Sequence, residues 1–273
     1  AGAPVGRAAA TPPPDAISYS SLADHARCGY GYYLRRVLGL AEVAPPPGLD
    51  AGAGTGPDPA VRGRIVHALL ERLDFAAPGP PSPAAVQAAV GDLGPDPDEV
   101  EAIAGLVGAF AASPLCARLA AADAPRPEAS FALPLGDVLV GGYIDVLARE
   151  ADGGLLVVDY KTDRVAPAAD LAERVSRDYG VQRRVYALAG LRTGVASVEV
   201  AYCFLRRPAE VVSVRYAAAD AARLERELAA VAGPLLAGRF PVAPRPHRGL
   251  CATCPGRARL CSWEEEVTLR DEP

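Results

Sequence analysis

Two aspartates and a lysine occupy two neighbouring apolar runs in the middle of the chain. Asp145 lies in the first run, and the second run leads directly into Asp159-Tyr160-Lys161. A glycine-containing turn between the runs predicts two adjacent strands that bring these side chains to one place. Carboxylates that hold a divalent cation, with an ammonium group beside them, suit the hydrolysis of phosphodiesters.

The spacing also indicates how each group would act. Asp159 and Lys161 are two residues apart, so on a strand their side chains lie on one face. Asp145 and Asp159 are the predicted ligands of the cation, and the carbonyl of Tyr160 would add a neutral oxygen. Lys161, the only lysine in the chain, would orient the water or offset charge on the phosphate. The motif alone leaves an alternative open, an exposed hairpin with a surface aspartate and an ion-paired lysine.

Two helical segments carry polar groups that would complete this site. His67 stands four residues before Glu71, on the same predicted helix face, and is a candidate ligand of the cation. Gln182 stands four residues before Tyr186, and its amide would hydrogen-bond near Lys161 or to a DNA backbone. The alternative for each pair is the ordinary polarity of a helix surface.

These residues need a framework of strands with a crossover helix. Apolar periodicity and turn residues predict both kinds of element. Helices are predicted at residues 18–40, 62–75, 84–90, 99–121, 168–191 and 218–236, and strands at residues 131–135, 138–147, 155–160, 198–205 and 211–216. This order is typical of a single α/β domain with a central sheet flanked by helices.

Four motifs in this order resemble the RecB-type branch of the PD-(D/E)XK nuclease superfamily. They are G-x-x-x-H-x-x-L-E, G-G-x-x-D, V-D-Y-K-T-D and Y-x-x-Q-x-x-x-Y, and the first predicted helix is similar as well. The resemblance covers about residues 17–263 and implies a restriction-endonuclease-like core with a central mixed sheet. It also implies Mg²⁺ or Mn²⁺ as cofactor. The family's metal and catalytic positions fall on His67, Asp145, Asp159 and Lys161, and its supporting position falls on Gln182.

Six cysteines divide into two groups. Cys116 and Cys203 lie in apolar segments and are expected to be buried small hydrophobic residues. The other four are Cys28 and a C-x2-C-x6-C tail of Cys251, Cys254 and Cys261. Four thiolates from two distant segments suit an iron–sulfur cluster or a structural zinc. A disulfide bond between two of these cysteines is a third interpretation.

The resemblance favours the cluster. AddB-type subunits and CRISPR adaptation nucleases have one cysteine in the first helix and three in the tail, and they join these segments with a 4Fe–4S cluster. The same layout here implies that a cluster joins the N- and C-terminal segments. The last gap is six residues where the family commonly has five, which keeps structural zinc as the alternative. Glycine follows Cys28 where the family has proline, and this departure is expected to affect the start of the helix.

The composition of the chain limits the kinds of partner that it is expected to bind. The chain has 273 residues and a net charge of −5, which argues against a protein that coats DNA nonspecifically. No apolar run approaches the roughly 20 residues of a membrane span, so no membrane partner is expected. The start lacks the order of a signal peptide, so a cytoplasmic protein is expected. We expect residues 1–16 to be a disordered linker and residues 17–273 to be the nuclease domain, with a cysteine-rich tail at about 240–263.

The function implied is that of a metal-dependent deoxyribonuclease of exonuclease type, acting on single-stranded DNA or DNA ends. It would be the nuclease module of a helicase–nuclease in DNA repair and recombination. The motor would lie in the same polypeptide or in a partner subunit. Two alternatives remain, a free-standing nuclease of the CRISPR adaptation type and a non-catalytic iron–sulfur or zinc scaffold that binds DNA.

Overall fold

The computed structural model describes residues 15–47, 59–91, 97–166 and 168–271. Most of the predicted linker, residues 1–14, lies outside these ranges, and Ala16 already begins the first strand. The contacts divide the chain into two compact units. The first is formed by Ala1–Asp50, Pro134–Val140 and Arg226–Pro273, and the second by Ala51–Leu133 and Gly141–Glu225.

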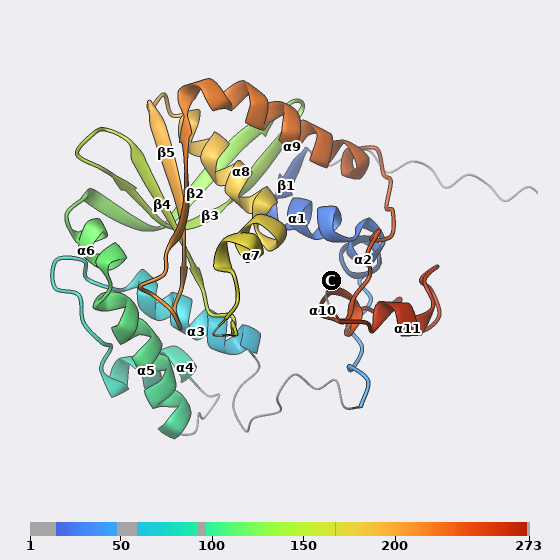
Figure 1. The fold of residues 1–273 in the computed structure, drawn as a ribbon, viewed down its shortest axis with the longest axis horizontal. Coiled ribbons are helices and arrows are strands. Elements are labelled where there is room, and N and C mark those ends of the chain that lie inside the picture. Colours follow the sequence, from blue (N-terminus) through green and yellow to red (C-terminus); the bar gives the residue numbers. More distant parts are fainter. Residues whose placement is uncertain (1–14, 48–58, 92–96, 167, 272–273) are drawn as a thin grey trace, which may run out of the picture. The chain divides into compact units, whose positions relative to one another are not determined.

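The described residues form a mixed six-stranded sheet, which confirms the predicted fold class (Figure 1). Its strands are β1 (Ala16–Ser18), β2 (Asp123–Leu135), β3 (Val138–Arg149), β4 (Leu155–Lys161), β5 (Ser197–Phe204) and β6 (Val212–Ala217). The order is β1-β3-β4-β5-β6, and β2 pairs with β3. Strand β4 pairs antiparallel with β3 and parallel with β5, and β5 pairs antiparallel with β6. A parallel pair requires a crossover connection, which the helices between β4 and β5 supply.

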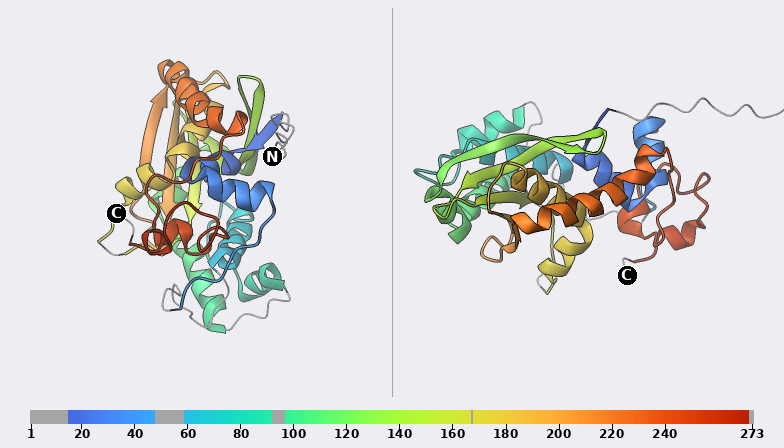
Figure 2. Two further views of the ribbon diagram at one scale, coloured as in Figure 1. Left: turned by 90° about the vertical axis from the view of Figure 1, so that its right-hand side faces the viewer. Right: turned by 90° about the horizontal axis from the view of Figure 1, so that it is seen from above.

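Successive side chains of β4 point to opposite faces of the sheet, so one set packs into a hydrophobic core and the other faces the candidate site. Leu156, Val158 and Tyr160 belong to a cluster of buried residues that also includes the inner faces of four helices. These helices are α3 (Pro59–Glu71), α4 (Pro83–Val90), α5 (Pro97–Ala111) and α6 (Pro114–Ala120). The residues between them in β4 face the opposite side, so Asp159 and Lys161 lie away from this core. Figure 2 shows the strands of this unit between α4 and α5 on one side and α8 on the other.

The crossover is two helices, and the prediction of one continuous helix over residues 168–191 was wrong. Helix α7 (Leu171–Asp178) ends at Tyr179, whose φ of −118° and ψ of 10° leave the helical region, and α8 (Gly180–Leu191) begins directly after it. Glycine at position 180 is a weak helix former, so the chain bends there at little cost.

Two other predicted helices are also divided. Residues 18–40 form α1 (Tyr19–Arg27) and α2 (Gly29–Tyr32), separated by the extended Cys28, and then a π-helical turn (Tyr33–Val37). Residues 99–121 divide between α5 and α6 because Pro114 starts a new helix behind the capping hydroxyl of Ser113. The remaining helices are α9 (Ala221–Leu236), α10 (Arg248–Cys251) and α11 (Glu265–Thr268).

No single helix among the described residues is long and apolar enough to cross a membrane. Helices α5 and α6 meet the length and composition criteria only as a pair, which is bent by 62°.

Candidate active site

The carboxyl end of β4 carries a buried acid that is paired with the lysine. Asp159 is 3% exposed, and its Oδ1 lies 2.6 Å from Nζ of Lys161. Gln182, on α8, donates from Nε2 to Oδ2 of Asp159 at 2.7 Å and accepts from Nζ of Lys161 at 3.2 Å. The amide therefore contacts both charged groups and holds the lysine and the aspartate in one arrangement.

A second cluster of ligand atoms lies in the same unit. One ligand atom each from His67, Glu128 and Asp145 lies within 4.8 Å of the others, and no other such group of three or more His, Cys, Asp or Glu residues occurs in the described part of the chain. Nδ1 of His67 lies 3.4 Å from Oδ1 of Asp145. Imidazole and carboxylate oxygens on three different elements suit a divalent cation of the magnesium or manganese type.

Backbone packing sets the positions of these ligands. The other oxygen of Asp145, Oδ2, accepts the backbone N–H of Tyr160 at 2.6 Å, which fixes the carboxylate of β3 against β4. On α3, a Cβ at Gly63 would lie 3.2 Å from Oγ1 of Thr162, the residue after β4. Glycine at this position permits the close approach of α3 to the strand end, and α3 presents His67 one turn later.

The structure brings His67, Asp145, Asp159, Lys161 and Gln182 together in one unit. Their catalytic roles, and a metal-ligand role for the carbonyl of Tyr160, remain predictions. The side chain of Tyr160 packs into the core, with its ring 4.7 Å from that of Phe110 and 6.1 Å from that of His67.

Sequence reasoning missed Glu128. The predicted strand began at Phe131, whereas β2 begins at Asp123, so Glu128 was left in a loop. Its φ of 45° marks an irregularity in the strand, and bulges of this kind often redirect a side chain next to an active site. An acidic residue a short distance before the G-G-x-x-D motif was the available signal.

The electrostatics describe a site crowded with negative charge. Burial, followed by the charges of Asp145 and Glu71, raises the pKa of Glu128. Burial opposes protonation of His67, but its hydrogen bond to Asp145 and the nearby carboxylate charges outweigh this effect and raise its pKa. Burial is the main cause that raises the pKa of Asp159 from 3.8 to about 6, although Lys161 opposes the rise. A bound cation would relieve this repulsion.

A pH dependence follows from Asp159. Between pH 3.8 and about 6 the folded, metal-free protein keeps a proton that the unfolded chain has lost, so the free energy of unfolding falls as pH rises through this window. Above it, a cation would restore stability by compensating the buried charge. We expect the rise in melting temperature on adding Mg²⁺ or Mn²⁺ to be larger at pH 7 than at pH 5, in thermal unfolding scans against EDTA.

The matched control is Asp159→Asn, which keeps the shape of the side chain and removes the titrating group. This variant should lose the part of the difference that Asp159 contributes. Protonation of His67 and Glu128, whose pKa values are also raised, should keep the rest. A wild-type protein whose metal-induced stabilisation is the same at both pH values would contradict the prediction.

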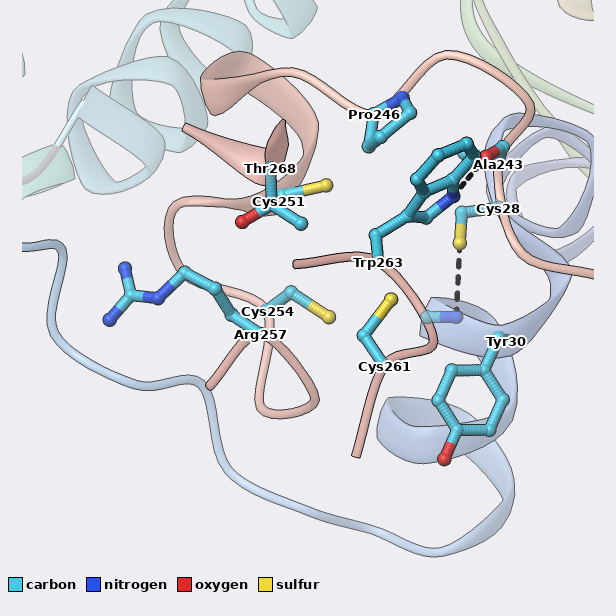
Figure 3. Close-up of a pocket in the computed structure, with 11 residues that line it drawn as sticks. Cys28, Tyr30, Ala243, Pro246, Cys251, Cys254, Arg257, Cys261, Trp263 and Thr268 are labelled. Atoms are coloured by element: carbon cyan, nitrogen blue, oxygen red, sulfur yellow. Dashed lines mark hydrogen bonds between the residues drawn. The ribbon is translucent and has the colours of Figure 1, made fainter. Parts of the chain in front are cut away.

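A separate cluster of thiols lies in the other unit. Cys28, Cys251, Cys254 and Cys261 line one pocket, and Figure 3 shows their sulfur atoms directed toward a common space. None of the six cysteines, all of them described, forms a disulfide. Tyr30 donates its backbone N–H to the carbonyl of Pro241 at 3.0 Å, which ties the first helices to the start of the tail.

The glycine after Cys28 has a packing role. A Cβ at Gly29 would lie 2.8 Å from Cδ of Pro241 and 3.0 Å from Cα of Phe240. The absence of a side chain therefore lets the tail lie directly on α2. The expectation that this glycine affects the start of the helix is consistent with its position, since it is the first residue of α2.

Comparisons with known proteins agree with this geometry. The profile of the PD-(D/E)XK nuclease superfamily matches residues 16–261. An ATP-dependent helicase/nuclease subunit from Desulforudis audaxviator (strain MP104C) is 35% identical over 185 residues, which make up 60% of this chain and 14% of that protein. The crystal structure of a candidate exonuclease from Eubacterium rectale has a TM-score of 0.50 at 12% identity and covers 92% of this chain and 90% of that one. This second likeness is one of fold.

Proposed function

Because this chain belongs to the PD-(D/E)XK nuclease superfamily, we propose that it is a metal-dependent deoxyribonuclease that hydrolyses phosphodiester bonds in single-stranded DNA or at DNA ends. Nucleases of this superfamily use divalent metals. The observation that carries the proposal is that one compact unit contains two groups of side chains suited to this chemistry. One is the group of metal-ligand atoms of His67, Glu128 and Asp145. The other is the buried pair of Asp159 and Lys161.

The chain's own residues have distinct tasks in this proposal. His67, Glu128 and Asp145 would hold Mg²⁺ or Mn²⁺, with Asp159 beside them. The cation would polarise the phosphate and promote ionisation of the attacking water. Lys161 would donate to a phosphate oxygen and offset the charge that develops there, while Gln182 keeps its ammonium next to Asp159.

Two exposed arginines beside the parallel strands support a nucleic-acid substrate. Arg164 follows Lys161 by three residues, and Arg206 follows Phe204, the register partner of Lys161, by two. Arg207 donates to two carbonyls of the loop that carries Arg164, at 3.1 and 3.3 Å. Burial and the charge of Arg164 lower the pKa of Arg206. Like charges held together at this edge would attract phosphates that flank the scissile bond.

A role as the nuclease module of a helicase–nuclease in DNA repair and recombination rests on the helicase/nuclease relative. The chain spans 14% of the length of that protein. The motor would therefore lie elsewhere in the same polypeptide or in a partner subunit.

The cysteine pocket supports a 4Fe–4S cluster as a structural cofactor. Its four thiols line one pocket, and their sulfur atoms are directed toward a common space. Four thiolates from two distant segments suit such a cluster, and structural zinc is the alternative. The cluster would join the first helices to the tail.

The test of the proposed function is cleavage of end-labelled DNA. With Mg²⁺ or Mn²⁺ we expect the labelled single strands to be shortened and EDTA to abolish the reaction. Single-stranded substrates, blunt duplexes and closed circles in parallel would separate action on strands and ends from internal cleavage. Absence of cleavage on all three substrates, with either metal, would contradict the proposed function and favour a non-catalytic scaffold that binds DNA.

A further inference from the structure

The ammonium group of Lys161 lies against aromatic rings as well as against its polar partners. Nζ is 3.9 Å from the centroid of the Tyr179 ring and 5.5 Å from that of Tyr202. Both distances are within the roughly 6 Å over which a cation is attracted to a ring face. Tyr179 makes the closer contact and stands at the break between α7 and α8.

The ring of Tyr179 is itself held on two sides. Its hydroxyl donates to Oδ2 of Asp163 at 2.9 Å. Its ring stacks on that of Tyr202, with centroids 5.6 Å apart and planes inclined by 22°. Tyr202 is fully buried, and its hydroxyl donates to the carbonyl of Tyr179 at 3.4 Å. Tyr179 is therefore a fixed surface beneath the lysine.

An aromatic ring suits this position better than a second acid would. An ammonium group has three N–H donors. This one donates to Gln182 and forms an ion pair with Asp159. A ring attracts the charge through its face without taking a strong hydrogen bond, so donor capacity remains for a phosphate oxygen. A second carboxylate would add negative charge where the phosphate must approach.

We propose that Tyr179 is a positioning residue for Lys161: its ring, fixed by Tyr202 and Asp163, aims the ammonium group at the substrate phosphate. The proposal rests on the proposed nuclease function, because it assigns Tyr179 a part in that reaction.

Two replacements of Tyr179 separate its ring from its hydroxyl. Tyr179→Phe keeps the ring and loses the bond to Asp163, whereas Tyr179→Leu removes the ring. We expect Tyr179→Leu to lower kcat by roughly 3- to 30-fold, the effect of one lost cation–π contact. KM should stay the same, and Tyr179→Phe should recover most of kcat. A kcat for Tyr179→Leu equal to that of Tyr179→Phe would overturn the proposal.

A second measurement reads the contact without any reaction. Because Lys161 is the only lysine, a protein labelled with ¹³C-lysine gives a single set of side-chain signals in an NMR spectrum. The ring current of Tyr179 should shift its ε-methylene protons upfield in the wild type and in Tyr179→Phe, and Tyr179→Leu should lose the shift. A wild-type spectrum without this shift overturns the proposal even if Tyr179→Leu fails to fold.

The cleavage assay and the NMR spectrum together distinguish failure of the proposed nuclease function from failure of the role assigned to Tyr179. If the wild type cleaves no nucleic acid, the proposed function fails and the assigned role of Tyr179 fails with it, whatever the NMR signal shows. If the wild type cleaves DNA and the ε-methylene shift is absent, only the role of Tyr179 is wrong.

Discussion

Replacing Lys161 with glutamine is expected to lower kcat for DNA cleavage by about 10²–10³-fold, the usual cost of removing one preorganised donor to a transition-state charge. Glutamine can still bond to Asp159 and Gln182, but it carries no charge to offset that of the phosphate. The expected metal ligands, His67, Glu128 and Asp145, do not include Lys161. Single-turnover cleavage at saturating Mg²⁺, with Mn²⁺ binding measured by calorimetry, checks both statements.

The matched control is Arg192→Gln, which removes one positive charge at the opposite end of α8, where Arg192 pairs with Glu225. Cleavage by this variant should equal that of the wild type. A Lys161→Gln variant that cleaves within threefold of the control, at equal metal occupancy, would show that Lys161 is a structural partner of Asp159.

If the pocket holds the proposed 4Fe–4S cluster, replacing Cys254 with serine is expected to remove the iron and the brown colour of the anaerobically purified protein. It should also lower the melting temperature by about 10 °C or more, because the binding energy of a structural metal group is part of the folding energy. Iron and acid-labile sulfide analysis, visible absorption and thermal unfolding measure these effects. A colourless wild type with stoichiometric zinc would replace the cluster with a zinc site.

Cys116→Ala provides the control for the loss of a thiol. Cys116 is fully buried in the helix-covered core of the other unit, so this variant should keep its iron and its colour. Loss of colour in both variants would show that the effect of Cys254→Ser reflects general instability.

The sequence predicts the strands of the site closely, since their signals are local. Strand β4 was expected at residues 155–160 and spans Leu155–Lys161, because an apolar run bounded by a turn and charged residues has few alternatives. The helix breaks at Cys28 and Tyr179 were missed for the opposite reason. Each is a single residue followed by a glycine. A glycine weakens a helix without fixing where it ends, so tertiary contacts decide the conformation.

Side-chain partners were harder to predict than positions in strands. Glu128 joins His67 and Asp145 only because β2 extends eight residues before its predicted start at Phe131. The contact between Lys161 and Tyr179 requires both the bend before Gly180 and the register of β4 with β5. Neither the extension of β2 nor that bend produces a pattern of apolar residues from which it could be predicted.

The cysteine pocket has a consequence for biosynthesis. Cys28 leaves the ribosome more than 200 residues before Cys251, the first of its three pocket partners, and closing so long a chain segment carries an entropic cost. The residues of the other compact unit, 51–133 and 141–225, are all synthesised before Cys251. Until the tail follows, the thiol of Cys28 lacks its pocket partners. A chain released before Cys261 would keep the strands of its candidate active site and lack the completed pocket. Insertion of the proposed cluster is thus expected only after the tail has been synthesised as far as Cys261.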